Sequence, residues 1–449
     1  MTTRKGFKRL VRARAAKTGE RYATARRVLL GEAGASGPPA SNDPRTSRQG
    51  IHPDTAAMAT VLAARGVVSP ITGRPLSEAL LLVAGGGVGA GYILWEFESR
   101  KGAILTLGFR NQWQYPGIPG WFGKTTERLG VPTVLHETSG ARAAREALDT
   151  ALADGSPVLA TVDQQSMGLW CQPPELSGYG GYPVVVTGRT EDGAYLVDDR
   201  GAAPFVVPAD VMAAARGRSV SYRNRLIELR PGPEPLSADR LRDTLMAGLA
   251  DQVDHLSSRS ESFSLPAWRK WSRLMTDRRN AKAWPRVFAV GHGLFDALVS
   301  MVEQVDDSVG ACGGHLRDLY ADGLEEAAGI LDLPALREAA GSWRASADLW
   351  QELADAAVPA HVDGAAEAVE LAEELHDAVM RGEPGRAQAR TAAEGLWEIR
   401  GRYASAWPLA EDETEALLAD LGRRLAAIHA AEQTALEATG RAIGRAIGR

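Results

Sequence analysis

The chain has 449 residues, about three times the length of a usual single domain, so two or three domains are expected. Its composition of 45% apolar and 24% charged residues excludes wholesale disorder. The two cysteines, Cys171 and Cys312, exclude a disulfide scaffold and favour a reducing compartment. The formal charge of −5 is uneven, because residues 1–30 carry +9 and the rest of the chain −14. The bulk of the chain is therefore not expected to bind nucleic acid.

Residues 1–30 alternate basic and apolar residues at roughly helical spacing, broken by a Lys-Thr-Gly-Glu turn at 17–20. This pattern predicts a short basic helical extension, which is a candidate contact for nucleic acid or another polyanion. Residues 31–50 are rich in Gly, Ser and Pro and predict a flexible linker. No apolar stretch of signal-peptide length follows the basic start, and the longest uncharged run, Ala79–Trp95, contains five glycines. We therefore expect a cytoplasmic protein without membrane contact.

Residues 51–231 mix helix and strand signals and predict an α+β domain. A periodic apolar stretch after His52-Pro53 predicts a first helix, and residues 141–153 predict another. Strands are expected at Ala103–Phe109, Pro157–Val162, Pro183–Thr187, Ala194–Val197 and Ser221–Leu229. The third and fourth of these are joined by Arg-Thr-Glu-Asp-Gly, which is typical of a hairpin.

Residues 236–440 predict an all-α domain, because apolar residues recur there at steps of three and four. The clearest stretches are Leu241–Leu249, Val287–Val302, Leu316–Leu331, Leu336–Ala357 and Leu417–Leu436. Proline residues separate them, as expected where helices end.

The glycine-rich run at residues 85–91 permits a phosphate-loop interpretation, but two features oppose it. The preceding Ser77–Val83 is rich in Leu and starts with Ser-Glu, which indicates a helix and not the strand that such a loop follows. No acidic residue lies about twenty positions further on, where a ribose partner would be needed. We expect a close backbone approach at these glycines and no bound cofactor.

Other chemistry-bearing residues are sparse. The eight histidines show no metal-ligand spacing, so no metal site is expected. Cys171 lies in a loop-like Gly-Leu-Trp-Cys-Gln-Pro-Pro segment and Cys312 between predicted helices, and both are expected to be inert thiols.

Polar residues gather where predicted strands end, which is where many α/β enzymes hold their acids. Asp163 follows the strand ending at Val162, and Asp198-Asp199 closes another strand. His52, at the start of the first helix, is placed to join them. The alternative for Asp199 is a turn with a local ion pair to Arg200.

Taken in order, these segments resemble a known family. Residues 51–230 resemble the N-terminal domain of butirosin biosynthesis protein H, and residues 236–435 the uncharacterised helical domain that commonly follows it. The segments that carry the first resemblance are His52 with its helix, Leu76-Ser77-Glu78-Ala79, the glycine run ending in Tyr92, Leu107-Gly108-Phe109-Arg110, Asp154-Gly155, Asp163, Pro183-Val184-Val185-Val186 and Val197-Asp198-Asp199-Arg200. Those that carry the second are Gly313-Gly314 with Arg317 and Tyr320, and Trp343-Arg344 with Trp350.

The resemblance implies a papain-like fold akin to bacteriocin-processing cysteine peptidases. Its namesake transfers an acyl group from a carrier protein to an aminoglycoside amine. In such folds a Cys at the start of the first helix, a His on a central strand and an acid on the next strand form the catalytic set. Here His52-Pro53 stands where the family has His-Cys, Tyr182 stands at the position of the base, and only the acid remains, as Asp198.

Three functions follow as hypotheses. The first is a non-peptidase accessory of bacterial secondary metabolism that binds a small molecule, a peptide or a carrier-bound acyl ligand. The second is an acyltransferase acting on carrier-bound thioesters without a cysteine, in which Asp198 and Asp163 position an amine and His52 is the general base. The third is docking on a polyanion through residues 1–30. Whether the chain is an enzyme, and its oligomeric state, are left open by the sequence.

Overall fold

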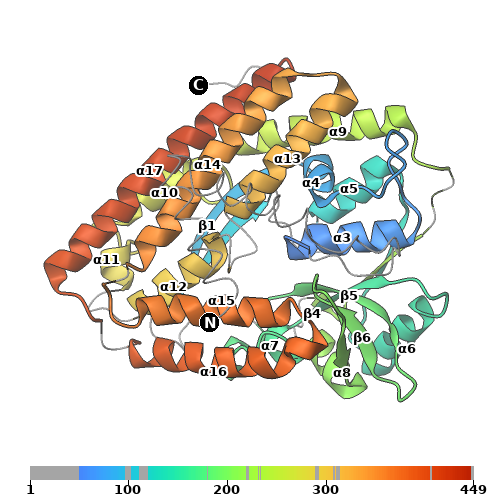
Figure 1. Ribbon diagram of the computed structural model, residues 1–449, viewed down its shortest axis with the longest axis horizontal. Helices are drawn as coiled ribbons and strands as arrows, with labels where there is room; N and C mark the ends of the chain where they lie inside the picture. Colours follow the sequence, from blue (N-terminus) through green and yellow to red (C-terminus); the bar gives the residue numbers. More distant parts are fainter. Residues whose placement is uncertain are drawn as a thin grey trace, which may run out of the picture.

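The computed structural model describes residues 50–96, 103–110, 120–178, 180–218, 222–230, 232, 234–288, 293–306, 309, 314–359, 361–404 and 407–445. The predicted basic extension, nearly all of the predicted linker, and Cys312 lie outside this part of the chain. An α+β region is followed by an all-helical region, so the predicted fold class is confirmed (Figure 1).

The α+β region is built on a six-stranded antiparallel sheet in the order β3-β8-β4-β5-β6-β7. The strands are β3 (Thr133–His136), β8 (Leu226–Leu229), β4 (Val158–Val162), β5 (Tyr182–Arg189), β6 (Tyr195–Asp198) and β7 (Phe205–Val207). Helix α3 (Pro53–Ala64) lies on one side of the sheet, and α6 (Ala141–Ala151) and α8 (Ala209–Arg218) on the other (Figure 1). Covered on both faces, the central β5 buries three consecutive valines, Val184 to Val186.

Most predicted elements of this region are present. The predicted hairpin is the β5–β6 pair, in which Val185 lies opposite Asp198, and α6 fills the predicted helix at 141–153. The expected strand at Ser221–Leu229 shortens to β8. The sequence patterns missed β3, β7, α8 and α5 (Gly120–Leu129), which are short or carry few apolar residues.

A second, two-stranded ribbon stands apart from the sheet. It consists of β1 (Val88–Glu96) and β2 (Ala103–Arg110), paired antiparallel, and it contacts α9 (Ala238–Leu256), α10 (Pro266–Leu274) and α12 (Leu294–Val305). The helix predicted before the glycine run is α4 (Glu78–Ala84), with Ser77 as its cap. The expected close approach is also present, because a Cβ on Gly85 would lie 2.0 Å from Nε1 of Trp121.

The helical region contains long antiparallel helices. They are α13 (Gly314–Leu331), α14 (Ala335–Ala357), α15 (Ala365–Val379), α16 (Arg386–Arg402) and α17 (Glu411–Ala442). The four-residue α11 (Trp284–Val287) precedes α12. The stretch expected to be helical over Val287–Val302 is divided, since α11 ends at Val287 and α12 begins at Leu294. Helices α15 and α16 form a hairpin beside the α+β region (Figure 1). Within the described chain, no helix has the length and apolar character to cross a bilayer.

A fully buried ion pair lies at the centre of the helical region. Arg317 of α13 donates from Nε and Nη2 to Glu432 of α17, at 2.7 and 2.9 Å. The same carboxylate accepts from the indole N–H groups of Trp268 and Trp350 and from the hydroxyl of Ser346. Arg317 also donates to two ribbon carbonyls, those of Gly89 and Phe109. One carboxylate and one guanidinium therefore join α10, α13, α14, α17 and both ribbon strands.

Replacing Glu432 with Gln preserves the shape of the side chain but leaves Arg317 buried without its counter-charge. We expect the free energy of unfolding to fall by about 3–5 kcal/mol, measured by chemical denaturation. Glu261→Gln is the matched control, since it removes the partner of the exposed Arg273 at 3.0 Å and is expected to cost less than about 1 kcal/mol. Equal losses in the two variants would contradict a central role for the buried pair.

Candidate functional site

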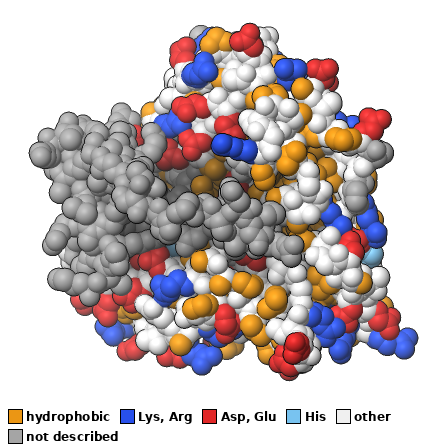
Figure 2. All heavy atoms as spheres, turned by 45° about the vertical axis from the view of Figure 1, so that its right-hand side comes forward, with side chains coloured by type: hydrophobic (Ala, Val, Ile, Leu, Met, Phe, Trp, Pro, Cys, Tyr) orange, Lys and Arg blue, Asp and Glu red, His pale blue; other side chains and the backbone are white. Residues whose placement is uncertain are grey.

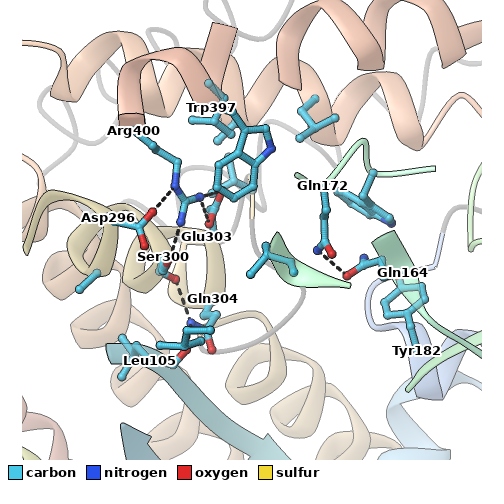
Figure 3. Close-up of a pocket in the computed structure, with 18 of the residues that line it drawn as sticks. Leu105, Gln164, Gln172, Tyr182, Asp296, Ser300, Glu303, Gln304, Trp397 and Arg400 are labelled. Carbon is cyan, nitrogen blue, oxygen red and sulfur yellow. Dashed lines mark hydrogen bonds and ion pairs between the residues drawn. The ribbon is translucent and has the colours of Figure 1, made fainter. Parts of the chain in front are cut away.

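A cavity of about 360 Å³ lies where the two regions meet (Figure 3). Its α+β wall comes from the start of α3, from α7 (Gln164–Met167) and the loop after it, and from the start of β5. Its helical wall comes from α12, α15 and α16, and β2 contributes a third side. The cavity is lined by residues that include His52, Pro53, Leu105, Gln164, Trp170, Gln172, Tyr182, Arg200, Asp296, Ser300, Glu303, Gln304, Ala372, Leu375, Leu396, Trp397 and Arg400.

The start of α3 is fixed by its own polar groups. His52 is buried, and its Nδ1 accepts from the backbone N–H of Asp54 at 3.2 Å, so the imidazole caps the helix. Pro53 follows at the first helical position, where its missing N–H costs nothing. The carboxylate of Glu78 accepts from the backbone N–H groups of Ile51 and His52 and from the hydroxyl of Thr55. Three backbone N–H groups around this helix start, those of Ile51, His52 and Asp54, are therefore engaged within the protein.

Tyr182 opens β5 and points its hydroxyl at a buried acid. It donates to Oδ1 of Asp199 at 2.7 Å, while Nε1 of Trp170 donates to Oδ2 at 2.7 Å. Burial raises the pKa of Asp199, although Arg200 and the two donors oppose this effect. Burial and the charge of Asp199 hold the pKa of Tyr182 well above its ordinary value. At neutral pH Tyr182 is therefore a protonated donor and not a base.

Arg200 links the end of β6 to the start of α3. Its Nη1 donates to the carbonyl of Ile51 at 2.7 Å, and its own carbonyl accepts from the N–H of Gly50 at 2.9 Å. Its guanidinium lies 5.8 Å from the ring centre of Trp170. Arg200 holds a left-handed backbone with φ of 53°, a strained state for a residue with a side chain.

Of the four site residues that the sequence predicted, only two line the cavity. His52 and Tyr182 line the same cavity, together with Pro53. Asp198 lies at a small adjoining recess beneath α3, and the acid that contacts Tyr182 is its neighbour Asp199. Asp163 instead caps α7 and accepts from Ser166 and from the N–H of Gly178, so it stabilises the loop behind the wall.

Within the described part of the chain, neither a thiol nor a metal site adds to this set. The Sγ of Cys171 is 3.6 Å from the carbonyl of Gly168, and burial raises the pKa of the thiol, so it is poorly placed to form a thiolate. Among the residues that the structure describes, no group of three His, Cys, Asp or Glu side chains is arranged to hold a metal ion.

The helical wall holds polar residues that the sequence analysis did not single out. Arg400 of α16 donates to Asp296 at 2.6 Å, to Glu303 at 2.8 Å and to Ser300 at 2.6 Å, and its guanidinium lies 4.3 Å from the ring centre of Trp397. Burial lowers the pKa of Arg400, but the two carboxylates outweigh it and hold the pKa above its ordinary value. The sequence of α16 shows helical periodicity and no other feature that would have pointed to these residues.

The protonation state of Tyr182 can be tested directly. Because its pKa is raised in the folded state, its contribution to stability is present below about pH 10 and is lost as the pH rises further. We expect the phenolate absorbance of the wild type and of Tyr182→Phe to coincide up to about pH 10 in the folded state and to differ after unfolding. A phenolate signal below that pH that the folded wild type shows and the folded Tyr182→Phe variant lacks would contradict the assignment.

Two family models match the chain. Residues 52–200 match the model described as butirosin biosynthesis protein H, N-terminal, and residues 267–383 match a domain of unknown function, DUF4872. No curated protein matches the chain. The first match contains the whole α+β wall of the cavity, and the second contains α12 and α15 of the helical wall. The chain thus carries an N-terminal domain of the butirosin biosynthesis protein H family, followed by a DUF4872 domain.

Proposed function

We propose that this protein binds a small molecule in the cavity between its two regions and does not form a covalent bond with it. The observation that carries the proposal is the polar set at the start of α3. Pro53 has no nucleophile, the Nδ1 of His52 is used as a helix cap, and the Tyr182 hydroxyl donates a hydrogen bond to Asp199. The family of residues 52–200 supports a role as an accessory protein of bacterial secondary metabolism.

The dimensions and chemistry of the cavity favour a small molecule over a folded partner. Its volume of about 360 Å³ falls within the range of roughly 300–1,000 Å³ that is common for small-molecule sites. Aromatic and aliphatic side chains, among them Trp170, Trp397 and Leu375, form much of the lining. A few polar groups lie between them, as in other sites that hold a ligand in one orientation.

Charge is balanced around the cavity. Arg400 is paired with Asp296 and Glu303, and Arg200 lies beside Asp199. On the molecular face drawn in Figure 2, acidic and basic side chains are interspersed among apolar ones. The ion pairs at the cavity favour an uncharged ligand or ligand segment over a highly charged one.

A variant that fills the cavity tests the proposal. Ala372 is a buried cavity residue on α15, and Ala372→Trp would occupy the space of a ligand. We expect ligands retained by the wild type after purification from a producing bacterium, detected by native mass spectrometry, to be absent from this variant. Ala387→Trp, at an exposed position of α16, is the control and should retain them. Equal ligand retention in both variants would contradict binding in this cavity.

A second function, acyl transfer from a carrier-bound thioester to an amine, is favoured by one observation. His52 and Tyr182 line the same cavity although 130 residues separate them in the chain. A thioester is already activated, so orientation of the amine beside an imidazole can supply much of the rate.

This second function predicts different results for two variants of His52. Asn can replace the imidazole as a helix cap but cannot act as a base, whereas Ala removes both roles. In a reconstituted assay with a carrier-bound acyl thioester and an amine, general-base catalysis predicts that both variants lose at least about 100-fold in rate. Full activity of His52→Asn would exclude this mechanism and leave His52 with its capping role.

A further inference from the structure

Trp397 of α16 presents an unused hydrogen-bond donor at the cavity. Its Nε1 is buried and has no partner among the residues that the structure describes, although the side chain lines the cavity (Figure 3). Buried donors in native proteins are nearly always satisfied. An unsatisfied donor beside a cavity is therefore explained most simply by an acceptor that arrives with a ligand.

Trp397 differs from other tryptophans of the described chain in the surroundings of its indole N–H group. Six indole N–H groups donate to acceptors inside the protein, namely those of Trp170, Trp268, Trp284, Trp343, Trp350 and Trp407. Trp271 also has a buried donor without a partner in the described chain, but it packs between the rings of Tyr92 and Trp284, away from the cavity. Trp397 combines the unused donor with a position on the cavity wall.

The neighbours of Trp397 fix the ring and strengthen its donor. The guanidinium of Arg400 lies 4.3 Å from the ring centre and is itself held by Asp296, Glu303 and Ser300. A cation over the ring draws electron density from the indole, so its N–H becomes a better donor. Since Arg400 is held by three groups, the ring is oriented before any ligand binds.

Two glutamines on the opposite wall offer a complementary pair. Nε2 of Gln172 donates to Oε1 of Gln164 at 2.7 Å. This bond leaves the Gln164 amide nitrogen as a donor and the Gln172 amide oxygen as an acceptor, and the structure gives neither another partner within its described residues. Figure 3 shows both side chains across the cavity from Trp397. A donor and an acceptor side by side match the two polar atoms of an amide.

We infer that Trp397 is a specificity-determining residue that selects an uncharged ligand carrying an amide, whose carbonyl oxygen accepts from the indole N–H. This inference rests on the proposed function of the cavity as a small-molecule site. A charged ligand of either sign would be desolvated without a free counter-charge, because Asp296 and Glu303 are paired with Arg400 and Asp199 lies beside Arg200. An apolar ligand would leave the indole N–H unsatisfied.

Two matched probes test the inference on the full-length protein. N-butylacetamide and N-ethylbutylamine share one skeleton, but only the first has a carbonyl and only the second is charged at neutral pH. We expect N-butylacetamide to move the indole proton of Trp397 downfield in a ¹H–¹⁵N spectrum, and N-ethylbutylamine to leave it in place. The resonance is assigned as the one that Trp397→Phe removes, and the methyl groups of Leu375 and Leu396 report entry of either probe into the cavity.

The affinities of variants supply the second readout. Trp397→Phe keeps an aromatic ring against Arg400 but has no N–H, so we expect the Kd of N-butylacetamide to rise roughly five- to tenfold and that of N-ethylbutylamine to stay within about twofold. Trp407→Phe, which removes an indole bonded to Thr414 outside the cavity, should change neither value.

The outcomes separate this inference from the proposed function. If the leucine methyl groups respond to N-butylacetamide while the indole proton of Trp397 does not, the cavity binds small molecules but Trp397 does not select them. Equal shifts with both probes would also overturn the selection of an amide. If neither the methyl groups nor the indole proton responds to any probe, the cavity is not a small-molecule site and the inference fails with it.

Discussion

The buried pair of Arg317 and Glu432 is the interaction on which the rest of the structure depends. Two charges removed from water are stable only if every polar atom finds a partner, and here the carboxylate takes three further donors while the guanidinium takes two backbone carbonyls. Those carbonyls belong to the ribbon strands, so the pair sets the position of β2. Gln304 then binds both the N–H of Leu107 and the carbonyl of Leu105, which places β2 and α12 together at the cavity.

The cavity therefore depends on how the α+β region and the helical region contact each other. The backbone of Ala202 donates to the carbonyl of Met380 at 2.8 Å, and a Cβ on Gly382 would lie only 1.8 Å from the carbonyl of Ala203. Glu383 accepts from the N–H of Val206 on the edge strand β7, which closes that edge of the sheet. The tip of the α15–α16 hairpin is thus held against the segment after Asp199, and its two helices carry Ala372 and Trp397 to the cavity.

The sequence predicted more of the fold than of the candidate site. Alternating or continuous apolar runs located β2, β4, β5 and β6, because burial selects residues in the pattern of each strand. The resemblance brought His52 and Tyr182 to one cavity, since it fixes the order of elements. It could not show which of the two neighbouring acids, Asp198 or Asp199, contacts Tyr182. Consecutive residues at a strand end point in different directions, so only one of the two can reach that side chain. The sequence could not predict that Trp397 and Arg400 line the cavity. A helical repeat shows which face of a helix is buried, but it does not show which residues of other elements pack against that face.

The polar groups at the start of α3 limit the chemistry that the site can perform. A helix start normally offers free N–H groups and a positive field that stabilise a thiolate or an oxyanion. Here the imidazole of His52 accepts one of these N–H groups, Glu78 accepts from the N–H groups of Ile51 and His52, and Asp54 adds a negative charge in the first turn. A cysteine introduced at position 53 would therefore begin a helix whose neighbouring N–H groups are already engaged and whose first turn carries Asp54. An unused donor lies on the opposite wall, at Nε1 of Trp397, where it suits recognition of an acceptor better than stabilisation of a nucleophile.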